Sequence, residues 1–338
     1  ELEGSWEAGH FLPDGTELTG EMYAERYIEF AKAMKAVDPT IRVGGAACGA
    51  GAGGFTEDLL RIAGDHVDFV SWHTYPLQST HTRERMLAAA ESDPVRAAQS
   101  VRQMLRRYQP ERADEIELGI TEWNLGLEGG MEVDMFGAIW SALFDGAMHR
   151  DGIDIANHWD AFTHHRGGSL VFGQGPYMRK AQYWAFWLWR HYMGDAVLAC
   201  DLEGPGELRA FATRSDDAVS IMAINASETT EARLDVTLEG FRPAAEGETA
   251  LLSYRECFWD RLANKPLWSG EPQVDPIATG PSFSVAVPPM AIKCVRVPSA
   301  DEPALSERAE RRRGMEGKDF GAAELRVLLP ESGYADTE

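Results

Sequence analysis

Apolar positions follow two different periods along the first 195 residues of the chain. Segments with an apolar residue at every third or fourth position predict helices, at 24–39, 55–64, 93–109, 135–150 and 179–195. Short and mostly apolar runs predict buried strands, at 41–51, 67–76, 117–126 and 153–162. Helices that alternate with such strands are typical of a parallel βα-repeating fold.

The pattern changes after residue 196. Short segments rich in Thr and Val predict antiparallel strands, at 207–214, 218–227, 232–240 and 282–298. Pro288 and Pro289 interrupt the last of these, as at a sheet edge or a bulge. We therefore expect a β-sandwich domain over 197–299, followed by a charged linker or tail over 300–338.

Each of the first strands is apolar where it begins and polar or aromatic where it ends, as in "VDFVSWHTYP" and "ELGITEWNLG". This gradient is typical of a (β/α)₈ barrel, in which the active site lies at the carboxyl ends of the strands. A doubly wound sheet has similar strands, but the glycine-rich segment 44–54 has neither the G-x-G-x-x-G spacing nor the lysine of a phosphate-binding loop. The predicted fold class is thus α/β, with the C-terminal half of a (β/α)₈ TIM barrel at 1–196 and an antiparallel β-sandwich after it. Because such a barrel has eight strands, we expect the chain to begin where the fourth one ends.

Charge and composition narrow the range of partners. Asp and Glu number 54 against 32 Lys and Arg, and the formal net charge of -22 repels nucleic acid and anionic membranes and favours neutral partners. No apolar run reaches the roughly 20 residues that a membrane span needs. The four cysteines are far apart, which predicts neither a zinc site nor a dense disulfide framework and leaves one disulfide open.

Four segments carry a resemblance to a known group of enzymes. In order and spacing, "ELEGSWEAGH", "YIEFAKAMKAVDPTIRVGG", "VDFVSWHTYP" and "ITEWN" resemble the second half of the retaining clan A glycoside hydrolases. They are most similar to family 51, the α-L-arabinofuranosidases. Family 39, the β-xylosidases and iduronidases, is close, because "RVGGAACGAGAGGFTEDLL" and "SWHTYP" resemble that family at least as well.

The resemblance implies a site with two carboxyl groups, one a nucleophile and one an acid that later acts as a base. Glu122 matches the nucleophile and Glu1 the general acid/base. His73 and Tyr75 match residues beside the nucleophile, and they lie on one side of their strand because side chains alternate.

Three further residues are expected to bind substrate. Trp6 would supply an apolar wall near Glu1, Asn124 would make a polar contact to a sugar, and Trp159 would stack on a sugar ring.

Simpler interpretations exist for most of these residues. Glu122 and Glu1 are otherwise solvated acids, His73 and Tyr75 a hydrogen-bonded core pair, and Trp159 a core aromatic. His158, His164 and His165 invite a metal hypothesis, but no carboxylate or cysteine stands at ligand spacing, so we expect neither metal nor cofactor.

The sequence thus predicts a retaining exo-glycoside hydrolase that releases arabinofuranose from plant-type polysaccharide. A family 39 β-xylosidase, a non-catalytic carbohydrate-binding protein and an inactive structural fragment are the alternatives. The expected partner is an oligosaccharide or polysaccharide, with no nucleic acid and no membrane, and the sequence leaves homo-oligomers and the localisation open.

Overall fold

A computed structural model describes residues 2–4, 9–50, 54–75, 82–125, 134–163, 170–172, 178–204, 206–260 and 265–301. Its first part alternates helices and strands as the periodicity predicts. These elements are α1 (Gly20–Val37), β1 (Gly44–Cys48), α2 (Phe55–Ala63), η1 (Gly64–His66), β2 (Phe69–Thr74), α3 (Arg83–Tyr108), β3 (Glu117–Trp123), α4 (Met135–Asp151), β4 (Ile155–His158) and α5 (Ala181–Tyr192).

The four strands β1 to β4 form one parallel sheet in the order β1-β2-β3-β4. Trp72 and Ile120 are buried in a core that also contains residues of all five α-helices. On the other face of the sheet, His73 is in register with Glu122. Among the described strands, β1 and β4 each pair on one side only, and Ala156 and Asn157 of β4 are exposed.

Helix α3 begins ten residues earlier than the sequence predicts. Asp93 and Pro94 resemble a helix start, because proline fits the first turn of a helix. In the structure, the side chain of Thr82 instead caps the helix by accepting a hydrogen bond from the Arg85 amide, and Pro94 is buried inside it. Packing overrides the local signal, since buried residues recur at helical spacing on both sides of the proline: Met86, Ala90, Ala98, Val101 and Leu105.

The C-terminal part is antiparallel. A six-stranded sheet has the order β15-β12-β17-β10-β9-β8, with bounds Gln273–Ala278, Glu246–Leu252, Ala291–Pro298, Ala218–Asn225, Leu208–Arg214 and Ala196–Leu198. Strands β11 (Ala232–Thr237) and β16 (Ser282–Val287) form a two-stranded sheet that shares an apolar cluster with β9, β10 and β17. Two smaller sheets consist of β13 (Cys257–Asp260) with β14 (Lys265–Ser269), and of β5 (Phe162–Thr163), β6 (Val171–Phe172) and β7 (Met178–Arg179).

The segment 282–298 is two strands rather than one interrupted strand. Pro288 and Pro289 separate β16 from β17, which belong to different sheets. The side-chain amide of Asn225 donates hydrogen bonds to the carbonyls of Val287 and Pro288, at 3.0 and 3.1 Å, and so holds this connection. The prolines are thus a link between sheets, where a missing N–H costs no ladder hydrogen bond.

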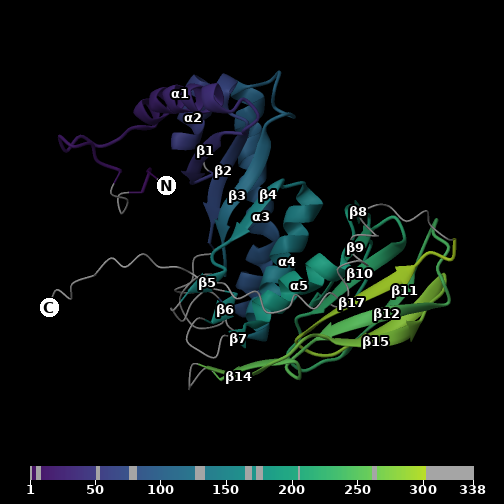
Figure 1. Cartoon of the computed structure of the whole chain (residues 1–338). Coiled ribbons are helices and arrows are strands. Elements are labelled where there is room, and N and C mark those ends of the chain that lie inside the picture. Colours follow the sequence, from purple (N-terminus) through teal and green to yellow (C-terminus); the bar gives the residue numbers. More distant parts are fainter. Residues whose placement is uncertain are drawn as a thin grey trace.

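Helices α4 and α5 lie between the parallel sheet and the six-stranded sheet (Figure 1). The aromatic segment 183–189 packs against the C-terminal strands, because Trp184 and Leu188 are buried in a cluster that includes Met222 and Ile292. The apolar core is therefore continuous across residue 196.

The cysteines are unpaired. Cys48, Cys200, Cys257 and Cys294 are all free thiols, so the disulfide that the sequence leaves open is absent. Residues 302–338 lie outside the described part of the chain. No described helix is both long and apolar enough to span a membrane.

One carboxyl group is buried in the middle of α4. Asp145 is 6% exposed, and its Oδ2 atom has no hydrogen-bond partner among the described residues. Burial disfavours the ionised form and raises the pKa of Asp145 well above its ordinary value. The folded state therefore holds this proton more tightly than the unfolded chain does.

This shift predicts how stability depends on pH. As pH rises above about 4, the unfolded chain releases the proton before the folded state does, so the contribution of Asp145 to the free energy of unfolding falls. Asp145→Asn is expected to remove this fall and to raise the free energy of unfolding at pH 8 by about 1–3 kcal/mol. Urea denaturation of both proteins at pH 4, 6 and 8 measures the difference, and parallel pH profiles would contradict it.

Candidate active site

Glu122 lies at the carboxyl end of β3 and is held through one oxygen. The hydroxyl of Tyr75 donates a hydrogen bond of 2.9 Å to Glu122 Oε2, and His73 Nδ1 lies 3.4 Å from the same atom. The His73 and Glu122 side chains are 13% and 21% exposed. The other oxygen, Oε1, has no partner among the described residues.

The sequence predicts this cluster and the structure brings it together. His73 and Tyr75 project from one side of β2, and the parallel register sets His73 beside Glu122. The pairing of β2 with β3 is irregular between Trp72 and His73: Trp72 lies opposite Ile120, whereas His73 lies opposite Glu122. Both side chains therefore reach the same carboxylate oxygen.

Trp123 fixes the strand end on which Glu122 lies. Its side chain is fully buried and stacks on Phe144 of α4, with ring centroids 4.6 Å apart. His158 of β4 meets the same indole edge-on at 5.0 Å. Trp123 thus packs β3 against α4, while the side chain of the adjacent residue, Glu122, points to the other face of the sheet.

Asn124 is buried and hydrogen-bonded within the protein. Its side chain is fully buried, its amide donates to the Trp159 carbonyl at 2.6 Å, and its Oδ1 accepts from Gln182 Nε2 at 3.0 Å. Gln182 in turn donates to Ser141 Oγ at 2.9 Å. These hydrogen bonds tie β3 to the segment after β4 and to α5, and a contact of Asn124 with a sugar stays a prediction. Gln182 and Ser141 carry no sequence signal, because only the packing of α4 and α5 brings them to Asn124.

Trp159 is available to a ligand. Its amide donates to the Trp123 carbonyl at 3.0 Å, which places its backbone at the end of β3, and its side chain is 46% exposed. The peptide bond to Asp160 is cis. The exposure excludes the interpretation of Trp159 as a core aromatic.

Glu1 and Trp6 lie outside the described residues, so the separation between Glu1 and Glu122 stays a prediction. Glu3, which the sequence does not single out, is described. Its carboxylate accepts hydrogen bonds from the amides of Phe55 and Gly49, at 3.2 and 3.4 Å. Gly49 directly follows β1, so Glu3 lies at the same edge of the parallel sheet as Glu122.

His158 is packed as an apolar residue. It lies against Trp123 and Phe186, and burial lowers its pKa to about 3, so the ring is neutral. His164 and His165 lie outside the described residues. Within the described part of the chain, no three His, Cys, Asp or Glu side chains converge as metal ligands would.

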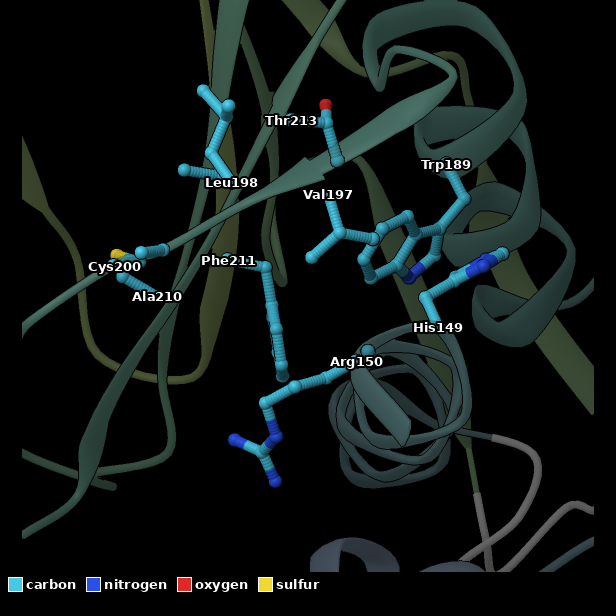
Figure 2. Close-up of a pocket in the computed structure, with 12 residues that line it drawn as sticks. His149, Arg150, Trp189, Val197, Leu198, Cys200, Ala210, Phe211 and Thr213 are labelled. Atoms are coloured by element: carbon cyan, nitrogen blue, oxygen red, sulfur yellow. The ribbon is translucent and has the colours of Figure 1, made fainter. Parts of the chain in front are cut away.

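A separate cavity of about 380 Å³ lies between α4, α5, β8 and β9 (Figure 2). Trp189, Val197 and Phe211 form its apolar walls, with Arg150 at one side. The described residues that line this cavity include no carboxylate, so it offers neither of the groups that glycosidic hydrolysis needs.

Comparison with known proteins agrees with this geometry. The model of the glycosyl hydrolases family 39 matches residues 10–130, a segment that contains His73, Tyr75 and Glu122. No curated protein sequence matches the chain.

Solved structures match over most of the chain. An α-L-arabinofuranosidase from Thermotoga maritima in complex with arabinose is 17% identical, with a TM-score of 0.69 over 88% of this chain and 64% of that one. The chain resembles the clan A glycoside hydrolases. A family 51 α-L-arabinofuranosidase from Bifidobacterium longum (17% identity, TM-score 0.62, 88% of this chain and 65% of that one) shares the fold. So does a family 44 xyloglucanase from Paenibacillus polymyxa in complex with xyloglucan (17% identity, TM-score 0.63, 84% and 62%).

The resemblance to clan A enzymes covers only part of each protein. The chain spans 64% of the length of the Thermotoga maritima structure, and at 17% identity that structure shows a shared mixed α/β fold. The family 39 match ends at residue 130, so it covers β1, β2 and β3 but neither β4 nor the C-terminal strands.

Proposed function

We propose that the chain carries the nucleophile of a retaining glycoside hydrolase. The observation that supports this most directly is the Glu122 carboxylate, which Tyr75 and His73 hold through a single oxygen at the carboxyl edge of a parallel sheet. A carboxylate oriented in this way presents its second oxygen for attack, as nucleophilic catalysis requires.

In the proposed mechanism, Glu122 Oε1 attacks the anomeric carbon while the bond to the leaving oxygen breaks. A second carboxylic acid, for which we propose Glu1, protonates that oxygen and then removes a proton from the water that hydrolyses the glycosyl-enzyme ester. The two carboxyl groups of a retaining enzyme lie about 5 to 5.5 Å apart. Tyr75 donates a hydrogen bond to the Glu122 carboxylate and so orients its side chain.

The proposed architecture follows from the same resemblance. Strands β1 to β4 correspond to strands five to eight of a (β/α)₈ barrel within residues 1–196. A β-sandwich over 197–299 and a charged tail over 300–338 complete the proposed domain organisation. In a barrel of this kind, Trp159 ends the eighth strand and its exposed ring forms a floor for the sugar.

The proposed substrate is a terminal α-L-arabinofuranoside of a neutral polysaccharide, because α-L-arabinofuranosidases, one of them of family 51, are among the similar structures. A β-D-xyloside is the second candidate, favoured by the family 39 match over residues 10–130. The net charge of -22 favours an uncharged glycan over an acidic one in either case.

The test is an assay of the natural full-length protein with 4-nitrophenyl α-L-arabinofuranoside and 4-nitrophenyl β-D-xyloside. We expect a higher kcat/KM on the first compound and initial release of the sugar with retained anomeric configuration, as followed by proton NMR. Inversion of configuration, or no hydrolysis of either compound, would refute the proposal.

A further inference from the structure

The hairpin of β13 and β14 stands apart from the six-stranded sheet. Its strands pair only with each other among the described strands, with Phe258 opposite Trp268. At its base, Glu256 accepts hydrogen bonds from the amide and the hydroxyl of Ser253, at 2.8 and 2.6 Å. The Gly270 amide donates to the Glu256 carbonyl at 2.7 Å, so hydrogen bonds join the two strands at the base of the hairpin.

One face of the hairpin packs on the rest of the protein. Cys257 and Trp259 are buried, and Ser269 Oγ donates to the Arg179 carbonyl at 2.5 Å. The indole of Trp184 in α5 donates to the same Ser269 hydroxyl at 2.9 Å. These contacts hold the hairpin against β7 and α5.

The opposite face is aromatic and exposed. Phe258 and Trp268 stack with ring centroids 4.9 Å apart at 19°, and Tyr254 lies 5.9 Å from Phe258. Trp268 is 44% exposed and Tyr254 is 37% exposed. The indole N–H of Trp268 donates to the Tyr254 carbonyl at 3.1 Å, which fixes the ring plane. We name Tyr254, Phe258 and Trp268 the aromatic platform.

A small sheet connects the hairpin to the segment that carries Trp159. From Trp159 the chain continues into β5, and the small sheet β5-β6-β7 leads to Arg179. Backbone hydrogen bonds connect the Leu170 amide to the Asp160 carbonyl and the Lys180 amide to the Leu170 carbonyl, both at 2.9 Å. Figure 1 shows β5, β6 and β7 in a row between the parallel sheet and β14.

We infer that the aromatic platform binds the polysaccharide chain beyond the sugar that is cleaved. This rests on the proposed function and extends it to a second contact with the substrate. Aromatic rings stack on the apolar C–H faces of sugars, and a ring whose plane is already fixed loses little entropy on binding. The platform presents no cation, since it consists of Tyr, Phe and Trp, so it suits a neutral glycan.

Size argues against a protein partner. Three partly buried rings offer on the order of 200–300 Å² of surface, whereas a stable protein complex covers ~800 Å² on each side. An extended glycan of two or three sugars matches the smaller area. The platform is therefore a binding surface for carbohydrate and not for a folded domain.

The test uses Trp268→Ala in the 338-residue chain, with Trp268→Phe and Leu267→Ala beside it. Leu267 is the matched control, because it precedes Trp268 in β14 and is 48% exposed but has no ring. Affinity electrophoresis in gels with neutral arabinoxylan measures binding without any need for hydrolysis. We expect Trp268→Ala to raise the Kd about tenfold, and Trp268→Phe and Leu267→Ala to change it less than about threefold.

Activity separates this inference from the proposed function. In the natural full-length protein, Trp268→Ala should raise KM for arabinoxylan and leave kcat/KM for the small nitrophenyl glycoside unchanged. Loss of arabinoxylan binding in a protein that hydrolyses nothing would support the platform and refute the hydrolase. Unchanged arabinoxylan affinity in Trp268→Ala, or an equal loss in Leu267→Ala, would overturn the platform.

If Trp268→Ala does not fold, an NMR titration of the wild-type chain tests the inference. The indole N–H signal of Trp268, assigned by its absence in Trp268→Phe, should shift on titration with arabinoxylan. No shift at saturating polysaccharide would overturn the inference.

Discussion

Glu122→Gln is expected to lower kcat for 4-nitrophenyl α-L-arabinofuranoside by about 10⁴- to 10⁶-fold, as the loss of a nucleophile does in other enzymes. The amide keeps the shape of the side chain and a partner for the Tyr75 hydroxyl, so the fold is retained. It removes the charged oxygen that would form the ester. Steady-state kinetics in the natural full-length protein give the ratio, and circular dichroism checks the fold.

Glu117→Gln is the matched control for this variant. Glu117 begins the same strand, β3, and pairs with Arg42 at the opposite end of the sheet from Glu122. An exposed ion pair of this kind contributes little, so activity should stay within about twofold of the wild type. A similar loss in both variants would mean that the charge of β3, and not a nucleophile, matters.

Glu1→Ala addresses the second carboxyl group. Without the acid, substrates with good leaving groups still form the glycosyl-enzyme, so partial activity should remain and azide should increase it. Complete loss in Glu1→Ala without rescue by azide would contradict separate roles for Glu1 and Glu122.

Trp123→Ala is expected to lower the free energy of unfolding by about 3–5 kcal/mol, because it removes a fully buried aromatic and leaves a cavity. The cavity would open against Phe144 and His158, and the end of β3 would lose its anchor to α4. Urea denaturation gives the difference. Activity should fall as well, since Glu122 is the adjacent residue.

Trp159→Ala is the control of the same residue type. Its ring is 46% exposed, so its loss should cost less than about 1 kcal/mol of stability. If Trp123→Ala and Trp159→Ala destabilise the protein equally, the assignment of Trp123 to the core is wrong.

The sequence predicts what depends on local pattern. The four parallel strands follow from short apolar runs. The resemblance to clan A enzymes predicts that His73 and Tyr75 lie beside Glu122, and the hydrogen bond from Tyr75 to Glu122 agrees with that prediction. Side-chain alternation alone predicts that His73 and Tyr75 share a face.

The sequence does not predict what depends on contacts between distant segments. Asn124 is predicted to contact a sugar, and the sequence gives no sign that Gln182 of α5, 58 positions away, donates a hydrogen bond to it. Pro94 reads as a helix start, yet tertiary packing carries α3 through it. The stacking of Phe258 on Trp268 depends on a hairpin register that no local signal in the sequence indicates.

The open edges of the parallel sheet have a practical consequence. Strands β1 and β4 each pair on only one side within the described part of the chain, and their free backbone groups accept a further strand. Under the proposed (β/α)₈ architecture, a second polypeptide that supplied complementary parallel strands would meet both edges at once and enclose the face that carries Glu122. The chain would then suit use as one half of a split enzyme, in which the proposed glycosidase activity reports the association of two separately expressed pieces.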